Sequence, residues 1–365
     1  MVKRKAPATG TRHQSKRPKP STTPQSFVWR PKDWDLKRGI THEVSLLVSR
    51  IDRKQLVVKK IMKIKSNSDN DPRPIEIRAL SLLPDCNRVV NTLFYSPSDP
   101  DPGRGTAFFA HYPLGDLAQW KERDFDSKNH KPIPESFIWR FFLQISQAQA
   151  FVQNLIGPNR DQRGCILHRD IKPKNILVVD NGTTYPSFKL HDFGCALMYR
   201  ESKAQQEARC GTFHYQPPEI PIINTTAAET WALGACVHFL ATGNAPIQNF
   251  GQYAVTRFNE NHKHPDSARG YSSPDHYYSA RVPRQVTPIN LSREQQRLRG
   301  IGPDNHQYSD ELNAWMTRCL SHSPNTRPTA DRLVNSMSLV ARGLLKRMGG
   351  KTALVDLDVK FSAIA

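Results

Sequence analysis

The sequence is short of acidic residues, of cysteine and of long apolar runs. Its 365 residues include 52 lysines and arginines but only 33 aspartates and glutamates, a formal net charge of +19. This excess favours acidic partners, nucleic acid or anionic surfaces, although it does not specify a fold. The 6 cysteines show no Cys-x-x-Cys pair, which favours a reduced intracellular compartment over a disulfide framework. No apolar run is long enough to span a bilayer, so we expect no membrane association.

The first 26 residues are also poor in large apolar side chains. Residues 1–26 are rich in Lys, Arg, Pro, Ser and Thr, and such a segment cannot bury enough surface to offset its ordering entropy. We predict a disordered basic tail. Its basic clusters, residues 3–5 and 16–19, are spaced like a bipartite nuclear-import signal. This predicts an import receptor as a partner and location in the nucleus, with the cytoplasm as a second compartment. The alternative is a tail that is merely solvated, or that contacts nucleic acid without specificity.

Residues suited to phosphoryl chemistry are concentrated in one polar loop between two apolar runs, which predict short buried strands. In this loop Asp170 could accept a proton from a hydroxyl, Lys172 could neutralise a transferring phosphoryl group, and Asn175 could hold a metal ion by its amide oxygen. Downstream, another apolar strand delivers Asp192 to a glycine turn. Two acids and an amide suit Mg²⁺, which prefers hard oxygen ligands and uses few protein groups beside phosphate.

Together these stretches resemble the catalytic loop and metal-binding turn of eukaryotic-type protein kinases. Residues 168–175 read H-R-D-I-K-P-K-N and residues 192–194 read D-F-G, in the family's order and each after an apolar strand. The resemblance implies an α+β, bilobal protein kinase-like fold. A small antiparallel β-sheet lobe with one key helix, residues 27–112, would precede a larger, mainly helical lobe, residues 113–345.

The same resemblance implies the cofactors and the site. ATP and Mg²⁺ are the expected cofactors. Asp170, Lys172 and Asn175 are the implied catalytic residues. Asn175 and Asp192 are the implied metal ligands, and Asp192 is also counted among the cofactor-binding residues.

A lysine of the small lobe should contact the phosphates of ATP. Two β-branched runs, 44–48 and 55–61, predict a hairpin. Its residues 57–60, V-V-K-K, resemble the kinase strand whose lysine meets the α- and β-phosphates. We take Lys59 as that lysine and expect Lys60 on the opposite face, because side chains alternate along a strand. Two solvent-facing edge lysines are the alternative.

A glutamate should hold this lysine in place. Apolar residues at helical spacing after residue 71 predict a helix that carries Glu76. The resemblance makes Glu76 the partner of Lys59 within a buried pair. A surface glutamate on the same helix is the alternative.

The loop that covers the nucleotide departs most from the family pattern, G-x-G-x-x-G-x-V. Counting back from Lys59, only Gly39 and Val44 remain as cofactor-binding positions, with Lys37 and His42 in the outer glycine places. Fewer glycines mean a stiffer loop and less backbone approach to phosphate. In the segment that resembles the connection between the lobes, Asp116 is either a ribose contact or a helix N-cap.

The large lobe carries further family features. Residues 211–219, G-T-F-H-Y-Q-P-P-E, resemble the end of a serine/threonine-kinase activation segment, which implies that Thr212 hydrogen-bonds near Asp170 and Lys172. Glu219 should pair with Arg327. Glu229 stands where the family has aspartate. Ser202 and Tyr199 are the candidate phosphate acceptors, unless the segment is ordered without modification.

Two further segments depart from the family pattern. Residues 244–309 are long and polar, which predicts an insertion. Residues 346–365 show no motif and are expected to form a C-terminal tail.

The predicted function is a serine/threonine protein kinase that transfers the ATP γ-phosphate, with Mg²⁺, to a Ser or Thr hydroxyl of a protein substrate. A pseudokinase acting as a nuclear scaffold or binding module is the alternative, favoured by the altered glycine loop and by Glu229. A nucleic-acid-binding or chromatin-binding protein is the third interpretation, favoured by the basic charge. A small-molecule kinase fits less well, because residues 211–219 are a peptide-kinase feature.

Overall fold

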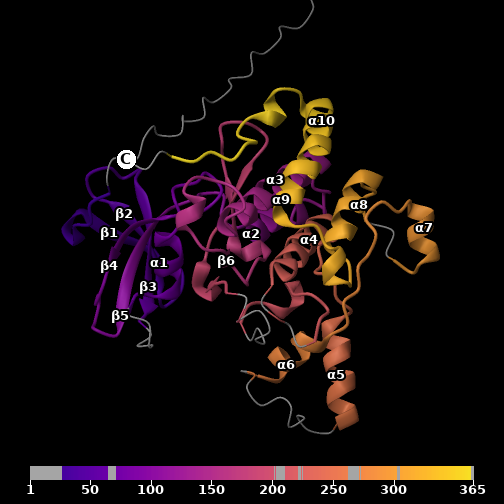
Figure 1. Cartoon of the computed structure of the whole chain (residues 1–365), viewed down its shortest axis with the longest axis horizontal. Helices are drawn as coiled ribbons and strands as arrows, with labels where there is room; N and C mark the ends of the chain where they lie inside the picture. Colours follow the sequence, from indigo (N-terminus) through magenta and orange to yellow (C-terminus); the bar gives the residue numbers. More distant parts are fainter. Residues whose placement is uncertain are drawn as a thin grey trace, which may run out of the picture.

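The computed structural model describes residues 27–64, 71–200, 202, 210–220, 223, 225–261, 271, 273–301 and 305–362. Figure 1 shows a smaller lobe built on a β-sheet beside a larger, mainly helical lobe, which confirms the predicted α+β, bilobal class. The basic tail predicted over residues 1–26 lies outside the described residues, so its disorder and its import signal stay predictions.

The small lobe is organised around a five-stranded antiparallel sheet. In the order β1-β2-β3-β5-β4, its strands are β1 (Trp34–Gly39), β2 (Val44–Ser49), β3 (Leu56–Lys63), β5 (Arg104–Ala110) and β4 (Thr92–Ser96). The predicted hairpin is β2–β3. Its turn is closed locally, because the Ser49 hydroxyl accepts hydrogen bonds from the backbone N–H groups of Ile51 and Asp52. The helix α1 (Ile75–Ser81) follows β3.

The two faces of this sheet pack against different partners. On one face, Leu47, Val57 and Phe108 form a separate cluster with the aromatic residues Phe27, Trp29 and Trp34. On the other face, Met62 and Ala107 join the main core together with residues of α1. Since side chains alternate along a strand, this division decides which β3 side chains point toward α1.

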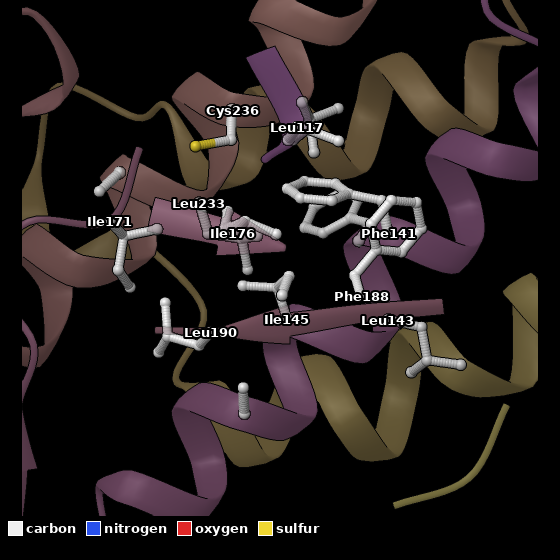
Figure 2. Packing of buried hydrophobic residues seen from close by; sticks show 14 of the residues in the cluster. Leu117, Phe141, Leu143, Ile145, Ile171, Ile176, Phe188, Leu190, Leu233 and Cys236 are labelled. Carbon is white, nitrogen blue, oxygen red and sulfur yellow. The ribbon is translucent and has the colours of Figure 1, made fainter. Parts of the chain in front are cut away.

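The large lobe is built on α3 (Glu135–Val152), which is buried along almost its whole length. Burial on all sides identifies a central core helix and not a surface helix. Figure 2 shows Phe141 and Ile145 of α3 in the same apolar cluster as Phe188, Leu190 and Ile176. The remaining helices are α2 (Leu117–Lys121), α4 (Thr226–Thr242), α5 (Phe250–Asn261), α6 (Pro274–Arg281), α7 (Arg293–Leu298), α8 (Asp310–Cys319), α9 (Ala330–Arg332) and α10 (Ser338–Gly349).

Short strands carry the polar loops across this core. β6 (Ile166–Leu167) pairs antiparallel with β9 (Leu197–Met198), and between them in the chain β7 (Ile176–Val179) and β8 (Ser187–Leu190) form an antiparallel hairpin. The turn between β7 and β8 contains Gly182 at φ +81°, a left-handed conformation that glycine adopts without steric cost.

Two segments were harder to interpret from sequence. The stretch predicted as an insertion, 244–309, contains α5, α6 and α7 within its described part. The predicted domain end at 345 falls inside α10, and the predicted C-terminal tail is packed onto the molecule, since Ala353 and Leu357 belong to the main core. In the part of the chain that the structure describes, no helix combines the length and apolar character needed to cross a bilayer.

Candidate active site

The polar loop between β6 and β7 holds Asp170 in a network of donors. Lys172 Nζ lies 2.7 Å from Asp170 Oδ2, and Asn175 Nδ2 donates to the same oxygen at 2.9 Å and to the Asp170 carbonyl at 2.8 Å. The other carboxylate oxygen, Asp170 Oδ1, is buried and has no hydrogen-bond partner among the described residues. A buried carboxylate oxygen without a donor is costly unless a donor from outside the chain meets it.

Lys172 also joins this loop to the segment before α4. Its Nζ donates to the Thr212 hydroxyl at 2.8 Å, which confirms the contact predicted between Thr212 and Lys172. Gly211, directly before Thr212, has φ +93°, and a Cβ there would lie 2.3 Å from the Arg169 carbonyl oxygen. The close backbone approach and the positive φ together require glycine at this position.

A lysine from the small lobe meets two carboxylates from different elements. Lys60 Nζ of β3 lies 2.7 Å from Glu76 Oε2 of α1 and 2.8 Å from Asp192 Oδ1, which follows β8. The side chains of Lys60 and Asp192 are 24% and 39% exposed, whereas that of Glu76 is 4% exposed. The cluster therefore opens to solvent on the side of Asp192.

The prediction that Lys59 is this lysine is wrong. Lys59 pairs across the sheet with Ser45 and Phe108, whereas Lys60 pairs with Val44 and Ala107. Cross-strand partners share a face, so Lys59 lies on the face of the aromatic cluster and Lys60 on the face toward α1. The two lysines do lie on opposite faces of the sheet, as predicted, but it is Lys60 and not Lys59 that lies on the face toward α1.

A signal for Lys60 was present in the sequence. The family strand reads V-A-I-K with the lysine last, and the V-V-K-K of residues 57–60 ends on Lys60. Val57 is only 2% exposed and belongs to the aromatic cluster, so the residue two positions on, Lys59, shares its face. Glu76 stays on the predicted helix but has Lys60 as its partner.

Burial and the charges of the neighbouring groups shift the pKa values of all three members of this cluster. Burial alone would lower the pKa of Lys60, but the charges of Glu76 and Asp192 outweigh it and raise that pKa above its ordinary value. Burial would raise the pKa of Asp192, yet the Lys60 ammonium brings it down to about 2. Burial raises the pKa of Glu76, and the charge of Lys60 offsets part of that rise. The cluster has one cation and two carboxylates, an excess of one negative charge when all three are ionised.

The metal-binding positions predicted from sequence are adjacent. The His191 N–H, one residue before Asp192, donates to the Asn175 carbonyl at 3.1 Å. No group of three or more His, Cys, Asp and Glu side chains suited to a metal occurs within the residues that the structure describes. The carboxylate of Asp192 and the amide oxygen of Asn175 are hard oxygen donors, and Asp192 belongs to the cluster with the negative excess. This set fits Mg²⁺, which commonly takes one or two protein ligands together with phosphate oxygens.

The other predicted cofactor-binding residues lie in the β1–β2 hairpin and at the start of α2. Gly39 ends β1 and Val44 begins β2, on either side of the hairpin turn. Thr41 stabilises that turn, because its hydroxyl accepts from the backbone N–H groups of Glu43 and Val44. Asp116 is the N-cap of α2 and accepts from Gln119 N at 2.9 Å, so the N-cap alternative is confirmed. A ribose contact stays a prediction.

Two carboxylates brace the large lobe beneath the loop. Glu229 of α4 is 3% exposed and accepts from the Arg169 backbone N–H at 2.6 Å, so the longer carboxylate still reaches the loop. Glu219 forms two hydrogen bonds of 2.7 Å with Arg327, which confirms the predicted pair.

The predicted phosphate acceptors stay predictions. Tyr199 donates its backbone N–H to the Cys165 carbonyl at 2.8 Å. Ser202 is exposed, but most of the segment after it lies outside the described residues.

Comparison with known proteins identifies the family. A family model for the protein kinase domain matches residues 35–338, so this chain belongs to the protein kinase domain family. It is similar to mitogen-activated protein kinase kinase 2 of Arabidopsis thaliana, with 26% identity over 209 residues, 57% of this chain and 46% of that protein.

Two further relatives are named as serine/threonine kinases. Identity is 31% over 148 residues to probable serine/threonine-protein kinase nek2 of Dictyostelium discoideum, 40% of this chain and 32% of that protein. It is 32% over 136 residues to serine/threonine-protein kinase Nek3 of Mus musculus, 37% of this chain and 23% of that protein. The chain thus matches less than half the length of each of these curated relatives.

Proposed function

We propose that this protein is a serine/threonine protein kinase that transfers the γ-phosphoryl group of Mg·ATP to a protein hydroxyl. The observation that carries this proposal is the state of Asp170. One of its oxygens is held by Lys172 and Asn175, while Oδ1 is buried without a partner in the described part of the chain. A substrate hydroxyl that donates to Oδ1 would satisfy it and be oriented for attack.

In the proposed reaction, the oxygen of the substrate hydroxyl forms a bond to the γ-phosphorus, and the bond from that phosphorus to the leaving oxygen of ADP breaks. Asp170 accepts the proton that the hydroxyl loses. Lys172, 2.7 Å from Asp170, offsets negative charge that develops on the transferring group. Lys60, held by Glu76, binds the phosphates. Mg²⁺, held by Asn175 and Asp192, would supply charge neutralisation on the phosphate oxygens.

The Ser/Thr assignment rests on the contact between Lys172 and Thr212 and on the names of the relatives. Lys172, two residues after Asp170, and the ending of residues 211–219 resemble the Ser/Thr class. Phosphoamino-acid analysis of a labelled generic substrate tests this directly. Phosphoserine or phosphothreonine is the expected product, and phosphotyrosine alone would overturn the assignment.

The decisive experiment is a transfer assay with ATP labelled on the γ-phosphate, comparing wild type with Asp170→Asn. Asparagine preserves the shape of the side chain but accepts a proton poorly, so we expect a loss of about 10²- to 10⁴-fold in kcat. Thermal unfolding of both proteins shows whether the fold is retained. Equal transfer by the folded variant would refute the role of Asp170.

A binding module without activity is the second candidate, and one feature favours it. The β1–β2 hairpin has glycine only at Gly39, and its turn is fixed by Thr41. A stiffer turn gives phosphate fewer backbone contacts. Wild-type protein that is folded but neither binds nor hydrolyses Mg·ATP would favour this candidate.

We also propose that residues 1–26 direct the protein to the nucleus. The basis is the two basic clusters in that segment. A reporter fused to residues 1–26 should accumulate in nuclei, and one with both clusters changed to alanine should not. A diffuse signal from the intact fusion would refute the proposal.

A further inference from the structure

The segment after α10 returns across the molecule to the loop between α1 and β4. Figure 1 shows it running from α10 back toward the small lobe. There Phe361 forms an antiparallel bridge with Cys86, and Asn87 N donates to the Lys360 carbonyl at 3.1 Å. Lys360 N donates in return to Asn87 Oδ1 at 2.7 Å. After a short 3-10 turn at Thr352–Leu354, the rest of residues 352–362 is held by pairing with the loop between α1 and β4.

The centre of this contact is Arg88, which is fully buried. Its guanidinium donates to Asp356 Oδ2 at 3.2 Å and to the carbonyls of Asp356 and Asp358 at 2.5 and 2.9 Å. The remaining contact is to Gln147 Oε1 of α3 at 3.0 Å. Most of the groups that satisfy this buried cation thus come from the C-terminal segment. A buried cation that loses such partners is strongly unfavourable.

A second buried arginine lies next to the first. Arg140 of α3 is fully buried and donates to the Ala353 carbonyl at 2.7 Å, to the Pro186 carbonyl at 2.9 Å and to Ser187 Oγ at 3.2 Å. Ser187 in turn donates to Asp356 Oδ2 at 2.7 Å. Asp356 therefore supplies negative charge to a region that holds two guanidinium groups, and the C-terminal segment supplies carbonyls to both.

Arg88 is joined to the active site through its backbone. The Leu190 N–H donates to the Arg88 carbonyl at 2.9 Å, and the Val90 N–H donates to the Leu190 carbonyl at 3.0 Å. Leu190 ends β8, two residues before Asp192. The loop that contains Arg88 also follows α1, which carries Glu76. Arg88 consequently sits where the two elements that bring carboxylates to Lys60 meet.

We propose that residues 352–362 are a positioning element for the Lys60–Glu76–Asp192 cluster, and that Asp356 is its positioning residue. By neutralising and anchoring Arg88, Asp356 fixes α1 relative to β8. The segment lies beyond residues 35–338, the part of the chain that the protein kinase family model matches. This proposal rests on the proposed kinase function only where it is tested by enzyme kinetics.

The backbone offers a clean substitution at this position. Asp356 has φ +51°, in the left-handed region that Asn tolerates best among residues with a side chain. Asp356→Asn therefore removes the charge with little added backbone strain. Asp358→Asn is the matched control, because the Asp358 carboxylate pairs with Arg342 on the surface and is 61% exposed. Both variants lose one carboxylate from the same segment.

The test is hydrogen–deuterium exchange of the full-length protein, which needs no turnover. In Asp356→Asn we expect the backbone amides of residues 75–91 to exchange about tenfold faster or more. The backbone amides of α3 and α4, in the large lobe, should keep their protection. Asp358→Asn should match wild type. Equal exchange in both variants, or acceleration throughout the large lobe without preference for 75–91, would overturn the proposal.

A milder variant keeps the test decisive if Asp356→Asn does not fold. Asn87→Ala removes the hydrogen bonds of Asn87 to Asp356 Oδ1 at 2.9 Å and to Lys360 N at 2.7 Å, but leaves Arg88 and Asp356 paired. It should accelerate exchange in the same region by a smaller factor, about threefold or more. Unchanged exchange in Asn87→Ala would count against the positioning role.

Steady-state kinetics distinguish positioning from general destabilisation. Asp356→Asn should lower kcat/KM for ATP by about tenfold and leave the KM for the protein substrate unchanged. If wild-type protein proves inactive, the proposed function fails while the exchange result still decides the role of the segment. An unchanged kcat/KM for ATP in an active enzyme would contradict the proposal.

Discussion

Two charge clusters of this molecule have opposite compositions. In the first, which we call the cleft cluster, Lys60 meets the two carboxylates of Glu76 and Asp192. In the second, which we call the rear cluster, Arg88 pairs directly with the Asp356 carboxylate and Arg140 reaches it through Ser187. The other hydrogen bonds of both guanidinium groups go to carbonyl oxygens. The cleft cluster has an excess of negative charge and is partly exposed, whereas both arginines of the rear cluster are fully buried. The first suits a cation and phosphate, and the second suits holding the chain in place.

The largest effect on activity is expected from a substitution of Lys60 in the cleft cluster. Lys60→Met should reduce kcat/KM for transfer by about 10²- to 10³-fold, because it removes a donor to the phosphates. Lys59→Met is the matched control on the opposite face and should change kcat/KM by about threefold at most. Loss of activity in the Lys59 variant with a fully active Lys60 variant would reverse the assignment.

The two clusters should differ in how much they contribute to the free energy of unfolding. Asp356→Asn should lower the free energy of unfolding by about 1–3 kcal/mol, because a buried guanidinium loses its counter-charge. Asp192→Asn should change it by about 1 kcal/mol or less, because Lys60 keeps Glu76 and the site is open to solvent. Urea titration with fluorescence detection measures both. A larger destabilisation from Asp192→Asn than from Asp356→Asn would remove the distinction.

A histidine beside the cleft cluster gives a pH test. Burial lowers the pKa of His191 from 6.5 to about 4. Below about pH 6.5 the unfolded chain binds a proton there, and the folded chain does not until about pH 4. The contribution of His191 to stability is therefore complete above pH 6.5 and is lost as the pH falls toward 4.

His191→Gln isolates this effect, because glutamine can still donate to the Lys174 carbonyl that His191 Nε2 contacts at 3.1 Å. Between pH 7 and pH 4.5 the unfolding free energy of wild type should fall by about 1–3 kcal/mol relative to that of the variant. The pKa of Asp192 is about 2, so that carboxylate titrates below this window. A difference that does not vary with pH would contradict the assignment.

The smallest effect is expected at Gly39. A Cβ at this position would meet nothing within 4 Å, and no positive φ requires glycine there. Gly39→Ala should therefore change the free energy of unfolding by about 0.5 kcal/mol or less. Its effect on the KM for ATP tests whether the hairpin approaches phosphate closely. A large rise in KM would show that the remaining glycine still has that role.

The residues of the cleft cluster could be predicted from the sequence to a much greater extent than those of the rear cluster. Asp170, Asn175 and Asp192 lie in motifs whose spacing marks them, and the structure places these residues in adjacent loops. Lys60 was missed because alternation places two adjacent lysines on opposite faces of the strand. The last place of V-V-K-K already favours Lys60, and the burial of Val57 on the aromatic face, which the sequence does not show, decides between them. The pair Glu219–Arg327 was found because both residues lie in family motifs.

The rear cluster could not be predicted from its residues. Arg88 and Asp356 lie far apart in the sequence, and neither belongs to a repeated pattern or a motif. Arginine and aspartate are usually exposed, so the sequence offers no sign that Arg88 is fully buried. Only the return of the C-terminal segment to the α1–β4 loop brings the two residues together.

The most direct test of the proposed Mg·ATP site is the binding of ATP with and without Mg²⁺, measured by titration calorimetry on wild type and on Asp192→Asn. We expect wild type to bind ATP more tightly when Mg²⁺ is present, and Asp192→Asn to lose that difference while it still binds ATP. A folded wild-type protein whose affinity for ATP does not respond to Mg²⁺, or that does not bind ATP, would contradict the proposed site.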